Sequence, residues 1–164
     1  MPVYNCSAYL HEAIESILDQ SFKSFEFIII NDGSTDNSAD IIKSFSDPRI
    51  RYFEHDNVGI AASLNKGIDE CKSNYIARFD GDDIAKKNRL EKQYDYLEKH
   101  QEYVAVGTHV DIIDKDGNYL YTKKSRTNWE EIKRCLPRTP LSHCVSMYRR
   151  NSVLECGKYN EKLL

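Results

Sequence analysis

Strand-like and helix-like patterns alternate along the first 100 residues, and this alternation constrains the fold more than any other feature. An apolar run from Phe25 to Ile30, interrupted only by Glu26, is typical of a strand buried on both faces of a parallel sheet. Shorter strand patterns cover residues 50–54 and 75–79. Strands that alternate with helices predict a three-layer α/β fold with a mixed, mainly parallel sheet.

Amphipathic helices are predicted between these strands. Leu10, Ile14 and Ile17 fall at helical spacing, and Ser7 is the expected cap of that helix. Further helices are predicted over residues 60–71 and 128–136. Two more are predicted from the apolar residues they carry, which are Ile41, Ile42 and Phe45 in one and Leu90, Tyr94 and Leu97 in the other, a long helix that starts near Lys86. We expect the strand order 3-2-1-4 in the first half of the sheet, with helices on both faces.

The pattern changes after residue 100. A strand is predicted over residues 104–110, Asp116-Gly117 is a strong hairpin signal, and a returning strand is predicted over residues 141–149. A chain of 164 residues is long enough for one core and too short for two ordinary domains. We therefore expect a single domain over 1–164, whose residues 1–100 form one half and whose residues 101–164 begin a second, incomplete half.

Charge and composition restrict the partners. The net charge is −3, from 23 basic and 26 acidic residues, and there is no basic stripe of the kind that nucleic-acid binding requires. No apolar run reaches membrane-spanning length and the start lacks signal-peptide features, so a soluble, cytoplasmic protein is predicted. The five cysteines form no Cys-x-x-Cys pair, which argues against thiolate metal sites and a disulfide framework.

Three carboxylates follow the strand pattern that begins at Tyr75. Asp80, Asp82 and Asp83 surround Gly81, which permits a tight turn, and they would repel one another without a cation or hydrogen-bond donors. The cluster therefore indicates a hard-metal site with open positions for phosphate oxygens, as in a nucleoside diphosphate complex. The alternative is a solvated acidic turn that caps the helix near Lys86.

Polar loops follow every predicted strand of the first half. They contain Tyr4-Asn5, Asn31-Asp32-Gly33, His55-Asp56-Asn57 and Asp80-Gly81-Asp82-Asp83. In an open parallel sheet, ligands bind beyond the carboxyl ends of the strands, where these loops would meet. The alternative is that these loops are solvated and only cap helices, because a single capping loop has the same composition as a ligand-binding one.

Several motifs together resemble one protein family. They are Pro2-Val3-Tyr4-Asn5, the helix end Ser16-Ile17-Leu18 with Gln20-Ser21-Phe22, Ile30-Asn31-Asp32-Gly33-Ser34-Thr35-Asp36, Asn57 and Gly59 with Asn65, and Phe79-Asp80-Gly81-Asp82-Asp83. In order and spacing they resemble inverting family 2 glycosyltransferases of the GT-A fold. The resemblance covers residues 1–100 strongly and extends more weakly through Ser142-His143 and Met147 to Arg150.

The resemblance implies roles for particular residues. It implies that Pro2, Tyr4 and Asn5 border the nucleotide base, that Asp32 accepts a hydrogen bond from the base, and that Asp80 contacts the ribose. The full set of nucleotide-binding residues it implies is Pro2, Tyr4, Asn5, Asp32, Ser34, Asn57, Gly59, Asn65, Asp80 and Gly81. It places Mn²⁺ or Mg²⁺ on Asp82.

Some of these residues also have ordinary structural interpretations. Tyr4 is equally a core aromatic at a strand end, and Asp32 a helix cap. The resemblance places His143 near the metal or the acceptor, although a lone His beside a strand is more often structural. Arg78 and Arg149 are candidates for phosphate contacts or for ion pairs.

Both ends depart from the family pattern. Members usually carry several apolar residues before the position of Pro2, and here that strand is reduced to a stub. The family supplies its catalytic base as an Asp shortly after a segment like Gly157 to Glu161, so the base is expected beyond Leu164. The sequence therefore looks truncated at both ends.

The leading hypothesis is transfer of a sugar from a nucleotide-sugar donor, with uridine as the favoured base, to a hydroxyl of a glycan or lipid-linked acceptor. The resemblance implies inversion, a role in cell-surface polysaccharide biosynthesis and peripheral association with the inner face of the membrane. The alternative is a donor-binding fragment without turnover. A nucleotidyltransferase or a dinucleotide-dependent oxidoreductase is disfavoured, because the seven glycines form neither Gly-x-Gly-x-x-Gly nor a P-loop.

Overall fold

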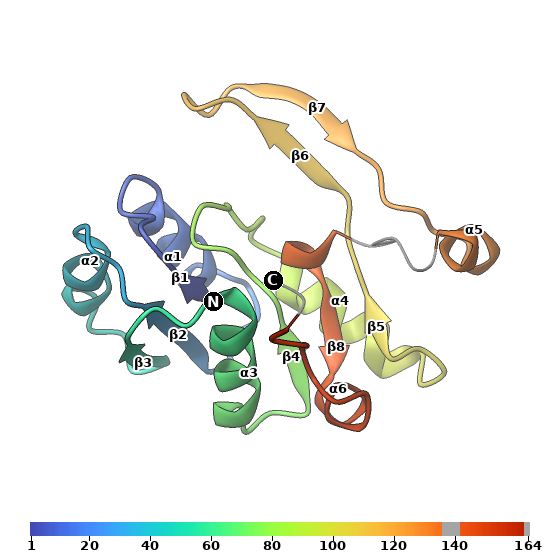
Figure 1. Cartoon of the computed structure of the whole chain (residues 1–164). Helices are drawn as coiled ribbons and strands as arrows, with labels where there is room; N and C mark the ends of the chain where they lie inside the picture. Colours follow the sequence, from blue (N-terminus) through green and yellow to red (C-terminus); the bar gives the residue numbers. More distant parts are fainter. Residues whose placement is uncertain (136–141, 163–164) are drawn as a thin grey trace.

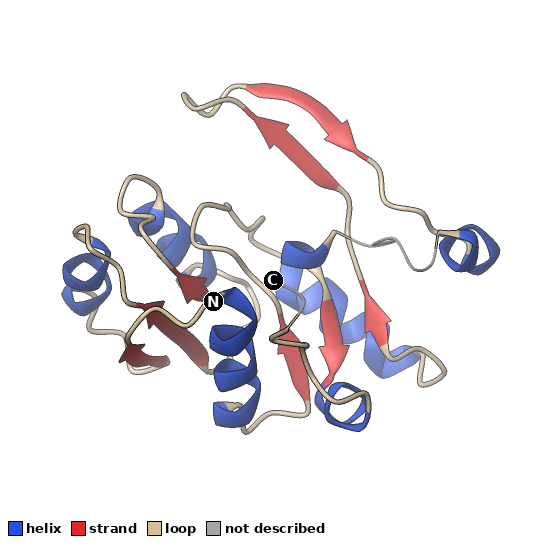
Figure 2. Ribbon diagram, in the orientation of Figure 1, coloured by secondary structure: helices blue, strands red, loops and turns tan. Residues whose placement is uncertain are grey.

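The computed structural model describes residues 1–135 and 142–162 and contains alternating strands and helices (Figure 1, Figure 2). The elements of the first half are β1 (Pro2–Val3), α1 (Leu10–Leu18), β2 (Phe27–Asp32), α2 (Ser38–Ser44), β3 (Ile50–His55), α3 (Ile60–Glu70) and β4 (Tyr75–Ala77). The second half contains α4 (Arg89–Lys99), β5 (Ala105–Val106), β6 (Val110–Ile113), β7 (Tyr119–Lys123), α5 (Trp129–Arg134), the short 3₁₀ turn η1 (His143–Val145), β8 (Met147–Arg149) and α6 (Arg150–Glu155).

The first three strands form a parallel sheet with the order β1-β2-β3. Pro2 lies opposite Ile30 across the first pair, and Phe27 lies opposite Ile50 across the second. The predicted α/β class and the parallel arrangement of these strands are confirmed, including the order 3-2-1.

Alternating side chains of β2 enter two different layers. Phe27 and Ile29 are buried with Leu10, Ile14 and Ile17 of α1. On the other face, the Cβ position of Gly67 in α3 is 3.9 Å from Ile30 Cγ1, and α3 packs on β2. This alternation explains why the strand is apolar on both faces and places helices on both sides of the sheet.

The entry to α1 differs from the prediction at one residue. The helix begins at Leu10, no side chain caps it, and Ser7 instead donates its backbone amide to the carboxylate of Asp36 at 2.9 Å. The loop that contains Ser7 is therefore bonded to residues 36–38 and not to the start of its own helix. Asp36 accepts hydrogen bonds from the backbone amides of Ser7 and Ser38.

β4 does not extend the parallel sheet. It pairs with β8 in a separate antiparallel sheet of order β4-β8-β5, so the expected neighbour relation between strands 1 and 4 is absent from the described residues. Met147 of β8 is buried with Leu90 and Leu97 of α4, which covers this second sheet. The predicted order fails because β4 pairs with β8, while β1 has only two residues with which to pair.

The strand predicted over residues 104–110 is interrupted. It divides into β5 and β6, and between them the Thr108 carbonyl and His109 Nδ1 each accept a hydrogen bond from Ser125. The hairpin predicted at Asp116-Gly117 is confirmed, and it joins β6 to β7. Figure 1 shows this hairpin standing away from the remainder of the molecule.

The returning strand is shorter than predicted. Residue 141 lies outside the described residues, residues 143–145 form the 3₁₀ turn η1, and only Met147–Arg149 are a strand. The turn forms because the Ser142 carbonyl accepts hydrogen bonds from the Val145 amide and the Ser146 hydroxyl. Among the described residues, no helix has the length and apolar character needed to cross a membrane.

Candidate nucleotide and metal site

The loops that follow β1 and β2 are joined by reciprocal hydrogen bonds. The Asn5 amide donates to Ser34 Oγ at 3.0 Å, and Asn5 Oδ1 accepts from the Thr35 amide at 2.8 Å. Asn5 adopts φ 52°, a left-handed conformation that Asn tolerates better than most residues. Two of the predicted site residues, Asn5 and Ser34, therefore lie together and shape one another's backbone.

Tyr4 lies beside these loops with its side chain in solvent. Its exposed fraction is 51%, which rules out the interpretation of Tyr4 as a core aromatic. An exposed ring next to an ordered polar loop is available for stacking on a planar ligand.

Asp36 makes this loop pair rigid. Burial by itself raises the pKa of Asp36, but hydrogen bonds from Ser38 and Ser7 outweigh it and hold the pKa of Asp36 well below its usual value. The carboxylate is therefore ionised near neutral pH, where it holds the loops that follow β1 and β2 together.

Asp32, at the end of β2, is buried with an exposed fraction of 3% and organises the loop after β3. Its Oδ1 accepts from the Val58 amide at 2.8 Å and its Oδ2 accepts from the Gly59 amide at 3.0 Å. Asn57 Nδ2 donates to the Asp32 carbonyl at 3.1 Å. The structure thus brings together the predicted residues Asp32, Asn57 and Gly59, and it gives Asp32 a positioning role whether or not it also contacts a base.

The close approach of these two loops requires glycine at position 33. Gly33 has φ 68°, and a Cβ at this residue would lie 2.6 Å from the backbone nitrogen of Asn57. A side chain would be both strained and obstructed there, so the sequence Asp32-Gly33 is needed for the packing of the two loops.

Two buried arginines support the carboxylates after β4. Arg78 is 3% exposed and forms an ion pair with Asp80. Arg89, at the start of α4, is 7% exposed, donates to the Arg78 carbonyl, and has its pKa lowered to about 10 by burial. The sequence offered two roles for Arg78, a phosphate contact or an ion pair, and the structure shows the ion pair. It fixes one oxygen of Asp80.

The three carboxylates do not all converge. One ligand atom each from Asp80, Asp83 and Cys144 lie within 4.8 Å of one another, whereas Asp82 is exposed and is not part of this group. Asp83 Oδ2 is buried without a hydrogen-bond partner among the described residues. Burial, opposed by a hydrogen bond with Cys144, raises the pKa of Asp83, and nearby Asp80 and Asp82 add to the increase.

This donor set fits a divalent cation. An orphaned buried carboxylate oxygen next to a second carboxylate is a site that a cation would stabilise, and carboxylate oxygens suit Mg²⁺ and Mn²⁺. The thiol of Cys144 is protonated near neutral pH, because burial and then Asp83 raise the pKa of Cys144 to about 11. The assignment of the metal to Asp82 remains a prediction, and Asp83, another member of the carboxylate cluster in the sequence, is a second candidate.

His143 is the first residue of η1 and precedes Cys144. Its Nε2 is 2.6 Å from the hydroxyl of Tyr159, and that hydroxyl is 3.4 Å from the hydroxyl of Tyr148. Burial and then the charge of Arg78 lower the pKa of His143, while Asp80 opposes them. The polar partner of the His143 ring is therefore Tyr159. The contact of His143 with a metal or an acceptor stays a prediction.

Asn65 is buried and holds the last described residues against α3. Its Nδ2 donates to the Tyr159 carbonyl at 2.9 Å and to Glu161 Oε1 at 2.7 Å, and its Oδ1 accepts from the Tyr159 amide. Both amide hydrogens are therefore used within the protein. The predicted contact between Asn65 and a nucleotide stays a prediction, and the structure shows a tether.

Sequence reasoning missed Cys144 and Tyr159. Cys144 has no second cysteine at metal-binding spacing, and the sequence does not place Tyr159 beside His143, because 16 residues separate them. Two features of the sequence could have indicated these residues. Cys144 directly follows the candidate His143, and Tyr159 lies in the Tyr159-Asn160-Glu161 segment that is part of the family resemblance. Arg149 proves to be structural, since it donates to the Tyr75 hydroxyl and to the Leu97 carbonyl.

Known proteins share this sequence pattern and this fold. The model of the family described as glycosyl transferase family 2 matches residues 1–157. Glycosyltransferase GlyA of Streptococcus pneumoniae serotype 4 is 34% identical over 134 residues, which are 80% of this chain and 19% of GlyA.

Comparison with solved structures shows that the fold is shared as well. S. aureus TarS in complex with UDP-GlcNAc superposes with a TM-score of 0.78 at 18% identity, over 96% of this chain and 46% of that one. Mannosyltransferase PcManGT of Pyrobaculum calidifontis, in complex with GDP-Man and Mn²⁺, gives a TM-score of 0.72 at 15% identity, over 98% of this chain and 46% of that one. The chain thus spans about half the length of these structures and about a fifth of GlyA.

Proposed function

The chain belongs to glycosyl transferase family 2, with a GT-A fold, and from this premise we propose that its strand-end loops bind the nucleoside diphosphate of a sugar donor. The observation that carries the proposal is the convergence of the loops after β1, β2 and β3 on Asp32 and Asn5, with the carboxylates after β4. The favoured donor is a UDP-sugar. UDP-GlcNAc bound to TarS supports this choice, whereas GDP-Man bound to PcManGT keeps guanosine as the alternative.

Each part of the site has a distinct task in this proposal. The exposed ring of Tyr4 stacks on the base, and the loop held by Asp32 bounds it. Arg78 holds Asp80 in position, so that little reorganisation of this carboxylate is needed when a donor binds. A divalent cation bound by the carboxylates of Asp80 with Asp82 or Asp83 would supply Lewis-acid stabilisation of the leaving diphosphate.

The transfer itself is proposed to be a single in-line displacement with inversion. The bond between the anomeric carbon and the diphosphate oxygen breaks as the acceptor hydroxyl oxygen attacks that carbon, and a carboxylate base takes the hydroxyl proton. The carboxylate of Glu161 is committed to Asn65, and that of Asp111 to Lys86 and Thr122. Neither of these two carboxylates is therefore free to take the acceptor proton among the described residues.

The acceptor is proposed to be a hydroxyl of a glycan or of a lipid-linked sugar, as in cell-surface polysaccharide biosynthesis. A lipid-linked acceptor would bring the protein to the inner face of the membrane. Measuring both donor binding and turnover distinguishes an active enzyme from a donor-binding domain that lacks a base. A domain without the base should bind donor but transfer sugar about 100 to 10,000-fold more slowly, which is the usual contribution of general-base catalysis to the rate.

Calorimetry with UDP and Mn²⁺ tests the donor site. We expect Asp82→Asn to weaken UDP binding at least tenfold, with Asp116→Asn, an exposed turn variant, as the matched control. Asp83→Asn decides between the two metal assignments, because loss of binding in this variant alone would place the cation with Asp80, Asp83 and Cys144. Equal affinities for UDP and ADP would contradict the proposal that Asp32 and Tyr4 recognise the nucleotide base.

A further inference from the structure

The hairpin of β6 and β7 is attached to the remainder of the molecule near its base. Asp111 of β6 forms an ion pair with Lys86, and Ser125 donates hydrogen bonds to the segment between β5 and β6. The two strands pair with each other and with no third strand of the described chain. A hairpin of two strands is marginally stable in water by itself, so this one needs a further strand or a packing surface.

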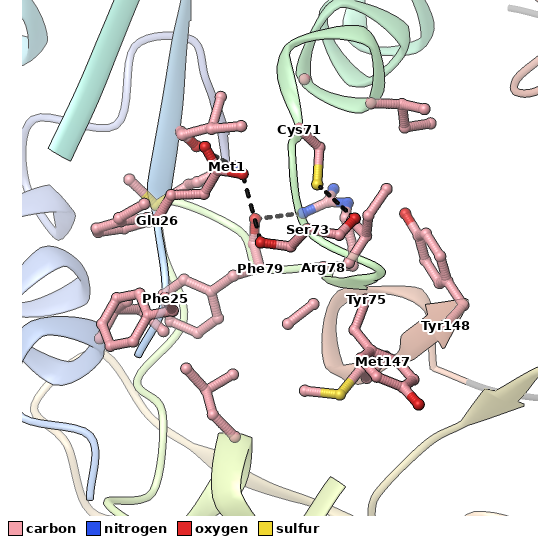
Figure 3. Close-up of a pocket in the computed structure, with 18 of the residues that line it drawn as sticks. Met1, Phe25, Glu26, Cys71, Ser73, Tyr75, Arg78, Phe79, Met147 and Tyr148 are labelled. Atoms are coloured by element: carbon pink, nitrogen blue, oxygen red, sulfur yellow. Dashed lines mark hydrogen bonds between the residues drawn. The ribbon is translucent and has the colours of Figure 1, made fainter. Parts of the chain in front are cut away.

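The cavity between the two larger sheets has a different location. Figure 3 shows Phe25 and Glu26 on one side of it and Tyr75, Met147 and Tyr148 on the other. The described residues that line it include none of β6 or β7. The surface of the hairpin is therefore a separate feature of the molecule, and Figure 1 shows β7 on the outer side of the hairpin.

Large apolar side chains are exposed along the outer part of this hairpin. The exposed fractions of Ile113, Tyr119, Leu120 and Tyr121 lie between 41% and 61%. Single exposed apolar residues are ordinary, but four on one hairpin form a patch of the kind that marks an interaction site. The strand β7 contains two tyrosines and no Pro and is an edge strand, and such an edge is a template for pairing with another strand.

Charge is distributed unevenly along the hairpin. The turn of residues 114–118 contains two Asp and one Lys, whereas residues 123–126 contain three basic residues and no acidic one. The turn lies at one end of β7 and the basic segment begins at the other end. Two such hairpins placed antiparallel bring opposite charges together at both ends, and two placed parallel bring like charges together. An anionic lipid surface would attract the basic end and repel the turn.

We propose that the partner of this surface is a second copy of the chain, with the two β7 strands antiparallel about a two-fold axis at Tyr121. In this register Tyr121 lies opposite the partner's Tyr121. On either side of the axis, Leu120 lies opposite the partner's Thr122, and Tyr119 lies opposite the partner's Lys123. The two hairpins then form one sheet of four strands in the order β6-β7-β7-β6, which satisfies the need for at least three strands. This interface does not depend on the proposed sugar transfer.

The side chains support this register. Tyr121 lies opposite Ile112 within each hairpin, so the shared sheet places these two residues and their symmetry copies in one row on one face. A cross-strand pair of aromatic rings at the centre of this row is favourable. Beyond the strands, the same register brings Asp116 of each turn toward the partner's Arg126.

A two-fold arrangement of this kind ends at two copies. Each β7 edge is used once, and no β7 edge is left for a third chain. The opposite edge is β6, whose residues Val110, Asp111 and Ile112 are half-buried. The Asp111 carboxylate is also held by Lys86 and Thr122. The proposed assembly is therefore a closed dimer and not an open chain of hairpins.

Sedimentation equilibrium of the 164-residue chain tests the interface. We expect a reversible dimer, and Tyr121→Lys should weaken dimerisation about tenfold or more, because it places two positive charges across the axis. Tyr9→Lys is the matched control and should leave the equilibrium unchanged, since Tyr9 is a similarly exposed tyrosine next to the start of α1. A wild-type chain that stays monomeric up to about 0.5 mM, or that forms assemblies larger than a dimer, overturns the proposal.

An exchange of charges tests the antiparallel register. We expect Asp116→Arg and Arg126→Glu each to weaken dimerisation about fivefold or more, because each change occurs at two symmetric positions, and the double variant to return to within about threefold of the wild type. The two residues lie beyond opposite ends of β7, so a pair within one chain cannot explain such a rescue. Failure of the double variant to restore the dimer contradicts the proposal, as does a monomeric chain whose binding to phosphatidylserine vesicles is lost in Arg126→Glu.

Discussion

At the scale of single residues, Gly33 shows how a backbone position can determine a binding loop. Its positive φ is shared by Gly117, but only Gly33 has a neighbouring backbone nitrogen 2.6 Å from a Cβ position. The sequence Asn31-Asp32-Gly33 predicts a turn. It did not reveal that the turn packs against residues 56 and 57, because that contact joins loops 24 residues apart.

We predict that Gly33→Ala destabilises the protein more than Gly117→Ala. Both variants incur the left-handed backbone cost, about 1–2 kcal/mol, and only Gly33→Ala adds a collision with Asn57. The free energy of unfolding from denaturant titration measures both. Equal losses in the two variants would mean that the loop after β3 moves aside at no cost.

The roles of some other residues could not be predicted from the sequence, for a physical reason. An arginine in a strand pattern serves equally well at a surface, in an ion pair or at a phosphate, and only the fold buries Arg78 against Asp80. The amide of Asn65 is similarly ambiguous, since burial turns a candidate ligand group into a tether. By contrast, the grouping of Asp32 with Asn57 and Gly59 follows from strand ends that must meet at one edge.

At the scale of elements, residues 158–161 form a strap across α3. Asn65 binds Tyr159 and Glu161, and Lys158 pairs with Asp69 at 2.9 Å. The strap carries the hydroxyl of Tyr159 to His143. The strap thereby joins α3 to η1.

We expect Asn65→Asp to release this strap. The new carboxylate cannot donate to the Tyr159 carbonyl and lies against Glu161, so two hydrogen bonds are replaced by repulsion, at a cost of about 1–3 kcal/mol. Hydrogen exchange over residues 157–162 should accelerate, while exchange in β2 should not. Asn160→Asp is the control in the same segment, because its Oδ1 only accepts, from the Lys162 amide; a similar acceleration in both variants would contradict the tether.

Helices and strands were predictable to different degrees. The helix predicted over residues 60–71 is observed as Ile60–Glu70, and the stripe of Leu90, Tyr94 and Leu97 lies in the helix Arg89–Lys99. Both were predictable because their apolar spacing is regular and tertiary contacts only reinforce it. The strand over residues 104–110 was divided by hydrogen bonds from Ser125, which lies 16 residues beyond His109. Pairing partners of strands depend on such distant contacts, and for this reason the position of β4 was also wrong.

At the scale of the whole molecule, the buried amine of Met1 links stability to pH. Burial, followed by the charge of Arg78, lowers the pKa of this amine from 8.0 to about 5, with Asp80 opposing the change. Between about pH 5 and pH 8 the unfolded chain therefore binds a proton that the folded chain does not. The free energy of unfolding must rise with pH through this window, and the penalty is fully present only below about pH 5.

The predicted size of this effect is up to about 4 kcal/mol, from about 1.4 kcal/mol for each of the three pKa units between 8.0 and about 5. Denaturant titrations at pH 5.5 and 8 measure it, at the same ionic strength. Acetylation of the Met1 amine should remove most of the slope and leave the smaller contribution of His143, whose pKa is also lowered. A slope that is the same in the acetylated protein would assign the effect to other groups.

The division of the strands into two separate sheets also has a mechanical consequence. β1-β2-β3 and β4-β8-β5 share no ladder of backbone hydrogen bonds among the described residues, whereas β2 and β3 are paired along all six residues of each. A force that pulls the two sheets apart is opposed by side-chain contacts and a few loop hydrogen bonds, and one that slides β2 past β3 must break a row of backbone bonds together. The molecule is therefore mechanically anisotropic, compliant between its sheets and stiff within them.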